Sequence, residues 1–129
     1  MTAAAADALE GAWVAVAAHL GRRSVPVAEL RVRYLLLEAQ HYGIVDHSNQ
    51  VVDRGDYRLN ADVTPATLDI VGRSGPNAGR TMQAIYALEG DELTVCYDLE
   101  GRARPRTMQP HEDELLLSIT YQRTAIPLV

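Results

Sequence analysis

The sequence has little or nothing of several residue types on which particular functions depend. It contains a single cysteine, Cys96, which excludes an intramolecular disulfide and a zinc site built from paired cysteines. No apolar run approaches the roughly 18 residues that a membrane-spanning helix needs. The chain has no lysine, and its formal net charge of -5 at pH 7 repels a phosphate backbone. We therefore expect no membrane insertion and no nucleic-acid partner.

Motifs of metal binding and of nucleophilic catalysis are missing as well. The chain has four histidines, but none lies in a His-Glu-x-x-His frame, so we expect no metal and no cofactor. None of the serines lies in the Gly-x-Ser-x-Gly turn of a hydrolase, and no catalytic residue can be named. The alanine-rich start of the chain lacks the basic and apolar regions of a signal peptide, which favours a cytoplasmic protein.

What is present is typical of one globular domain. The chain has 129 residues, of which 47% are hydrophobic and 22% are charged, and this length fits a single core. We expect a flexible leader over residues 1–8, one domain over residues 9–124, and a tail over residues 125–129.

Short segments of alternating hydrophobicity, separated by Gly, Pro, Asn and Asp, predict roughly eight or nine antiparallel strands. In residues 115–123 the alternation places Leu115, Leu117, Ile119 and Tyr121 on one side, which we expect to be the core side. The other expected strands are residues 32–38, 51–52, 57–60, 67–71, 82–88 and 93–98. The tripeptide Arg54-Gly55-Asp56 reads as a turn, the segment around Gly90 as a tight hairpin, and residues 72–79 as a flexible loop.

The first apolar segment fits either a helix or a strand. Leu9, Trp13, Val16 and Leu20 have helical spacing. Gly11 and the β-branched valines of the segment are less favourable in a helix than in a strand, so we prefer a strand. A short helix fits either residues 27–31, after Pro26, or the alanine-rich leader. The whole pattern predicts an all-β protein, an antiparallel up-and-down barrel whose closure leaves no exposed sheet edge.

Two residues far apart in the chain extend this interpretation. Gly11-Ala12-Trp13 opens the first strand and Arg123 ends the last one. This pair resembles the lipocalin (calycin) arrangement, in which a Gly-x-Trp on the first strand meets a C-terminal Arg. A guanidinium stacked on the Trp ring would stabilise the closed end of the barrel.

Further segments are similar to a family of small bacterial domains of unassigned function, known from planctomycetes and other bacteria and lipocalin-like in predicted fold. The similar segments are residues 65–70, 84–97 and 104–108. The sequence departs from the family pattern at Ala84, where Gly is usual, and at Met108, where Phe is frequent. The resemblance implies a fold and no particular activity.

Several residues are candidates for a site in the lumen. Tyr34, Tyr86 and Tyr97 each lie in an expected strand, and a phenol offers an apolar body with one hydrogen bond. Met82 and Cys96 are further candidates, although Cys96 also fits a small buried hydrophobic residue outside any site. Because small residues are many and large aromatics few, an eight-stranded barrel of this sequence is expected to keep an unfilled lumen.

One carboxylate in an apolar strand also needs an explanation. Asp69 lies between Leu68 and Ile70, and Arg104 is the expected partner in a structural ion pair. A solvated Asp69 on the outer face of its strand is the alternative.

Three functions are compatible with these features. The first is the binding of a small, largely apolar molecule in the lumen. The second is a cofactor-independent cyclase or isomerase that orients a flexible, polyketide-like substrate in the same lumen. The third is an interaction or regulatory module with a fully packed interior. The oligomeric state does not follow from the sequence.

Overall fold

The computed structural model describes residues 8–101, 103–108 and 116–125. These residues form nine strands and one short 3-10 helix, η1. The elements are β1 (Gly11–Leu20), β2 (Arg23–Ser24), η1 (Val27–Glu29), β3 (Tyr34–Glu38), β4 (His41–Val45), β5 (Val51–Asn60), β6 (Ala66–Ser74), β7 (Thr81–Glu89), β8 (Glu92–Asp98) and β9 (Leu116–Thr124). Within the described residues, no helix is long and apolar enough to cross a membrane.

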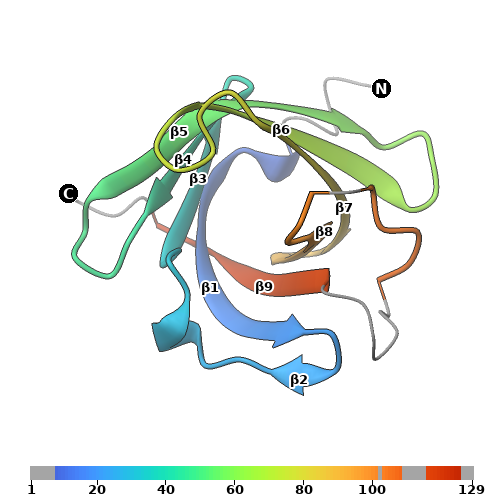
Figure 1. The fold of residues 1–129 in the computed structure, drawn as a ribbon, viewed down its shortest axis with the longest axis horizontal. Coiled ribbons are helices and arrows are strands. Elements are labelled where there is room, and N and C mark those ends of the chain that lie inside the picture. The colour runs from blue at the N-terminus through green and yellow to red at the C-terminus, as the bar shows by residue number, and fades with distance from the viewer. Residues whose placement is uncertain (1–7, 102, 109–115, 126–129) are drawn as a thin grey trace.

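The strands close into a barrel (Figure 1). From β3 to β9, each strand pairs antiparallel with the next, β1 pairs with β3, and β9 returns to pair with β1. Eight strands therefore form the closed ring, and the two-residue β2 is an addition at the end of β1. This confirms the expected all-β, up-and-down barrel, and η1 lies within residues 27–31, one of the two segments that fit a short helix.

The alternating direction of the strands gives the barrel two different ends. We call one the closed end: it carries residues 8–10, the turn at 39–40, the loop 61–65 and the turn at 90–91. We call the other the open end: it carries η1, the turn 46–50, the loop 75–80 and residues 99–101.

The first segment is a strand, as preferred from the sequence, and it contains a β-bulge. Ala15 pairs with Tyr121 while Ala17 pairs with Thr120, so Val16 has no partner of its own in this ladder. Val16 is accordingly 48% exposed. The bulge shifts the inward-facing positions by one residue, because an extra residue in one strand reverses the faces that follow it. The shift places Trp13 and Leu20, seven residues apart, on the same face, a spacing that also fits a helix, whereas Val16 points outward.

The sequence-based division of β5 is wrong. Residues 51–52 and 57–60 were expected as two strands with a turn at residues 54–56, but one continuous strand runs from Val51 to Asn60. Gly55 lies in the middle of this strand for a steric reason. A Cβ atom there would lie 2.0 Å from the carbonyl oxygen of Val71 and 2.6 Å from the ring of Tyr42. The glycine therefore permits a close approach and does not form a turn.

The core face expected for residues 115–123 is correct, whereas the lumen position expected for Tyr34 of β3 is wrong. Leu93 and Val95 of β8 are buried in the main core, as are Leu117, Ile119 and Tyr121 of β9. Leu115 lies outside the described residues. In β3 the buried residues are Leu35 and Leu37, so Tyr34 and Leu36 face outward and are half-buried. The hairpin at Gly90 is present, whereas residues 72–74, expected in a loop, belong to β6.

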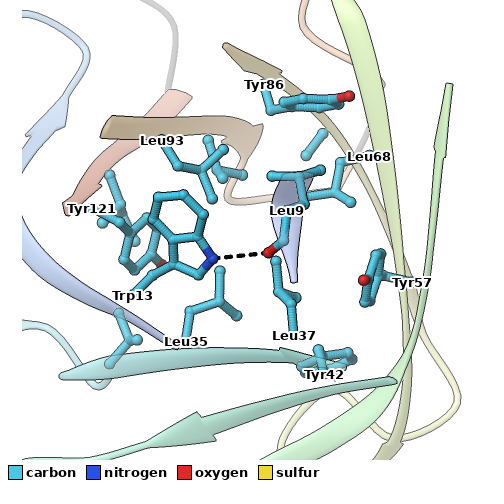
Figure 2. Close-up of a cluster of buried hydrophobic side chains, with 14 of the residues drawn as sticks. Leu9, Trp13, Leu35, Leu37, Tyr42, Tyr57, Leu68, Tyr86, Leu93 and Tyr121 are labelled. Atoms are coloured by element: carbon cyan, nitrogen blue, oxygen red, sulfur yellow. Dashed lines mark hydrogen bonds between the residues drawn. The ribbon is translucent and has the colours of Figure 1, made fainter. Parts of the chain in front are cut away.

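The main core lies inside the barrel, and Figure 2 shows its large side chains packed around Trp13. Its largest fully buried side chains include Trp13, Tyr57, Leu9, Leu68 and Leu93. The indole Nε1 of Trp13 donates a hydrogen bond to the Leu9 carbonyl oxygen over 3.0 Å, so the one polar atom of the ring is paired. This packing leaves the interior below the open end for a cavity.

Candidate ligand-binding cavity

A cavity of about 300 Å³ lies in the lumen. Seven of the eight ring strands contribute inward-facing side chains to its wall, one example from each being Leu35, Ile44, Asp53, Ile70, Met82, Val95 and Ile119. Six of these seven side chains are apolar. A cavity of this size is at the lower end of the range for small-molecule sites, which are typically about 300–1,000 Å³.

Asp53 is the one carboxylate among the described residues that line this cavity. Its side chain is buried, with 6% of its surface exposed. The Tyr42 hydroxyl donates to Oδ1 over 2.8 Å, and the Asn77 side-chain amide donates to Oδ2 over 2.8 Å. Each carboxylate oxygen thus accepts one hydrogen bond from an uncharged donor.

Two glycines make this arrangement possible. The ring of Tyr42 packs in the space that a Cβ of Gly55 would occupy. Its hydroxyl therefore reaches Asp53, which lies two residues before Gly55 on the same inward face of β5. A Cβ on Gly72 would lie 2.0 Å from the carbonyl oxygen of Asn77. The loop 75–80 can therefore fold against β6 and direct the Asn77 amide into the barrel. Backbone hydrogen bonds from Gly72 to Arg80 and from Gly79 to Gly72, both 2.9 Å, hold the base of this loop.

Three tyrosines that line the cavity have a raised phenol pKa. Burial raises the pKa of Tyr97 to about 12, and the nearby Asp53 carboxylate adds to this shift. Burial also raises the pKa of Tyr42, with further contributions from the hydrogen bond to Asp53 and from its charge. Tyr121 lines the cavity as well, and burial raises its pKa further. All three phenols remain protonated at neutral pH; the Tyr42 proton is donated to Asp53, whereas Tyr97 and Tyr121 can donate hydrogen bonds to a ligand.

The open end supplies a rim that differs from the wall. Leu30 and Arg31 follow η1, Pro76 and Arg80 belong to the loop 75–80, and Leu99 follows β8. Both arginines are exposed, and Leu99 is 43% exposed. The rim therefore combines apolar side chains with solvated positive charge.

Only two of the five residues that the sequence indicated for the lumen line the cavity. Met82 and Tyr97 do so. Tyr86 faces inward but is packed in the main core, with 7% exposure. Tyr34 faces outward because the register of β3 directs Leu35 and Leu37 inward, and the Arg33 guanidinium lies 5.0 Å from its ring centre.

Cys96 is buried on the other side of the barrel wall. It packs with Ile85, Leu116 and the partly buried Met108 in a small cluster on the outer face of β7 and β8. We call these four residues the outer cluster. The alternation of β8 explains the placement, because neighbours of the inward-facing Val95 and Tyr97 must point outward. Tyr34 and Cys96 are therefore removed from the candidate site.

Asp69 and Arg104 lie together next to the outer cluster. The Arg104 guanidinium places Nη2 2.6 Å from Asp69 Oδ1, and its Nη1 donates to the Ala84 carbonyl oxygen over 2.8 Å. Asp69 is half-buried on the outer side of β6. The pair links residues 103–108 to β6 and β7, which is a structural position remote from the cavity.

Arg123 lies over Trp13 at the closed end. The guanidinium carbon is 4.3 Å from the centre of the Trp13 ring. Its nitrogens also donate to the carbonyl oxygens of Glu10 (2.9 Å) and Ala8 (2.6 Å) and to the Asp91 carboxylate (3.1 Å). Gly11 has a φ of +130°, and a Cβ there would lie 3.2 Å from Arg123 Nη1. The glycine thus provides both the backbone geometry and the space that the arginine needs.

A second, shallower groove of about 790 Å³ crosses the outer face of β4, β5 and β6. Asp56 forms an ion pair there with Arg73 and accepts a 2.8 Å hydrogen bond from His41 Nδ1. The Arg73 and His41 hydrogen bonds lower the pKa of Asp56. Since His41 and Arg73 are both largely exposed, this network is solvated and we assign no binding role to it. Among the described residues, no three His, Cys, Asp or Glu side chains gather as they would around a metal ion.

The sequence did not indicate Asp53, Tyr42 or Asn77. One signal was present: Asp53, Gly55, Tyr57 and Leu59 alternate with exposed residues and so share a face. The assignment of residues 54–56 to a turn interrupted this alternation. Asn77 could not be found from the sequence, because its position depends on how the loop 75–80 folds.

Comparison of the chain with protein-family models, with curated proteins and with solved structures gives no match.

Proposed function

We propose that this protein binds a small, largely apolar molecule in the lumen of its barrel. The observation that carries the proposal is the cavity of about 300 Å³ below the open end, with a largely apolar wall. A ligand would be held by burial of apolar area, which contributes about 25 cal/mol per Å². The phenols of Tyr97 and Tyr121 would supply directing hydrogen bonds.

The asymmetry of the two ends supports the same proposal. The closed end is filled by Trp13 and covered by Arg123, whereas the open end leaves the cavity lined by exposed rim residues. An interaction module with a fully packed interior, the third function compatible with the sequence, does not predict such a cavity. The lipocalin-like interpretation and the resemblance to the planctomycete-type family stay predictions that agree with this barrel.

Binding is tested with N-phenyl-1-naphthylamine, an uncharged aromatic probe whose fluorescence increases in apolar surroundings. We expect saturable binding to the wild-type protein with one site per chain. In Met82→Trp, the larger indole would occupy the cavity, because Met82 lies in its wall with 7% exposure. We expect at least a tenfold loss of probe affinity in this variant.

Gln83→Trp is the matched control, since Gln83 is the next residue of β7 and is exposed on the outer face. It should bind the probe as the wild type does. No saturable binding to the wild type, or equal affinity in Met82→Trp and Gln83→Trp, would contradict the proposal.

The cyclase or isomerase alternative uses the same cavity and requires formation of a product from a linear polyene or polyketide-like substrate.

A further inference from the structure

Asp53 differs from the other paired aspartates of the protein in the charge of its partners. Asp56, Asp69 and Asp91 each pair with an arginine, and all three lie on the outside of the barrel or at its closed end. Asp53 is more deeply buried, with 6% exposure, and its partners in the described chain are the uncharged groups of Tyr42 and Asn77. The most buried of these carboxylates is therefore held without a cation.

This arrangement is energetically unusual. A buried charge is normally paired, because removal from water without a counter-charge is costly. The two donors do not exhaust the carboxylate, since each of its oxygens can accept about two hydrogen bonds. The two arginines among the cavity-lining residues, Arg31 and Arg80, are exposed at the rim, where water screens their charge.

We infer that Asp53 recognises a basic nitrogen of the ligand, so that the cavity takes a small molecule with an apolar body and a protonated amine. The inference rests on the proposed lumen binding and specifies the chemical class of the ligand. A protonated amine has up to three N–H donors and supplies the cation that Asp53 lacks. A carboxylate ligand would instead be repelled by Asp53.

The position of Asp53 also fixes the orientation of such a ligand. Asp53 accepts a hydrogen bond from Asn77, which belongs to the loop 75–80 of the open end. The nitrogen would therefore lie near the mouth, and the apolar body would extend toward Leu37 and Leu68 in the deeper wall. This is the order expected for a ligand that enters with its apolar end first.

The test uses three compounds with the same aromatic body: phenethylamine, which is protonated at neutral pH, the uncharged phenethyl alcohol, and the anionic hydrocinnamate. Affinities are measured by isothermal titration calorimetry and by displacement of N-phenyl-1-naphthylamine. We expect the wild type to bind the amine more tightly than the alcohol and the carboxylate most weakly. Asp53→Asn should lose at least tenfold in affinity for the amine and less than threefold for the alcohol.

Asn77→Ala is the second variant, because it removes one donor to Asp53 and keeps the carboxylate. It should keep the preference for the amine; if Asp53→Asn does not fold, the comparison of amine, alcohol and carboxylate in the wild type still decides the inference. Equal wild-type affinities for the amine and the alcohol, or an unchanged preference in Asp53→Asn, would overturn the inference while leaving lumen binding intact. If neither the naphthylamine probe nor the three compounds bind, the proposed function itself fails.

Discussion

Arg123 joins several parts of the closed end. Its guanidinium stacks on Trp13 and donates hydrogen bonds to two segments: residues 8–10, through the carbonyl oxygens of Ala8 and Glu10, and the turn that carries Asp91. The planar guanidinium can stack and donate in several directions at once, which a lysine ammonium cannot do. Arg123 thus connects the first and last strands of the barrel.

We expect Arg123→Ala to lower the free energy of unfolding by about 1–3 kcal/mol, through lost stacking and lost hydrogen bonds. Urea denaturation followed by fluorescence measures the change directly, because Trp13 is the single tryptophan of the chain. Arg54→Ala, at an exposed position of β5, should change stability by no more than about 0.5 kcal/mol. An unchanged midpoint and an unchanged emission spectrum in Arg123→Ala would contradict this account of the closed end.

Two buried tyrosines should respond in opposite ways to loss of their hydroxyl. Tyr42→Phe leaves Asp53 with one donor fewer and should cost about 1–3 kcal/mol. The Tyr57 hydroxyl is buried and has no hydrogen-bond partner in the described residues. Tyr57→Phe should therefore be neutral or stabilising, because it removes an unpaired polar group. Thermal denaturation of the two variants decides the point, and a larger loss in Tyr57→Phe than in Tyr42→Phe would refute it.

At the scale of elements, residues 103–108 contribute Met108 to the outer cluster, and Arg104 of the same segment pairs with Asp69. Cys96, in the same cluster, is 0% exposed and is the one cysteine of the chain. A thiol reagent can reach it only when the segment or the barrel opens, so its labelling rate reports that opening.

Arg104→Ala should raise the rate of Cys96 labelling by about tenfold, since it removes an ion pair and a hydrogen bond worth together roughly 1–2 kcal/mol. Labelling with a chromogenic disulfide reagent under native conditions measures the rate. Arg106→Ala is the matched control, because Arg106 belongs to the same segment and is exposed. Equal rates in the two variants would show that the pair does not hold the segment.

The elements that the sequence predicted well are those with an uninterrupted period of two. In β8 and β9, Val95, Tyr97, Ile119 and Tyr121 alternate without a break, and each alternates in the structure as it does in the sequence. The interpretation was weaker wherever one residue disturbs the period. The bulge at Val16 places Trp13 and Leu20 on one face at a spacing that also fits a helix. Gly55 was assigned to a turn because it is a glycine, but it is needed in the strand because a side chain there would collide with Val71 and Tyr42.

The candidate site was predicted less well than the fold, for a physical reason. Alternation tells which residues share a face, but it does not tell which face points inward, and the assignment of Tyr34 failed on this point. Cys96 is excluded by alternation itself, because Tyr97, the next residue of β8, faces inward. The pairing of Asp53 with Asn77 depends on contacts between segments that are distant in the chain. Such contacts follow from the register of β5 with β6, which no local pattern contains.

At the scale of the whole molecule, the tyrosines determine how the protein responds to high pH. Burial is the main cause that raises the pKa of five of them, Tyr42, Tyr57, Tyr86, Tyr97 and Tyr121. The unfolded chain releases phenolic protons near pH 10, whereas Tyr97 in the folded protein keeps its proton to about pH 12. Because the folded state binds more protons in this range, stability falls as pH rises.

We therefore expect full stability below pH 10 and a progressive loss from pH 10 to pH 12, at about 1.4 kcal/mol per pH unit for each such phenol. The chain has no lysine, so no lysine ammonium titrates in the same window. Tyrosinate absorbance and melting temperature, followed together, should change in a single coupled transition. Gradual ionisation of all tyrosines without unfolding would contradict the burial that the structure shows.

The pairing of the first strand with the last also determines how the barrel responds to mechanical force. Ala12 pairs with Thr124, so β1 starts and β9 ends side by side at the closed end. Because these strands are antiparallel, a pull between residues 8 and 125 loads their hydrogen bonds one after another, which is an unzipping geometry and not a shearing one. The stacked Trp13 and Arg123 lie at the point that bears this load first. The barrel should therefore open at low force, and Arg123→Ala should lower that force further in single-molecule pulling.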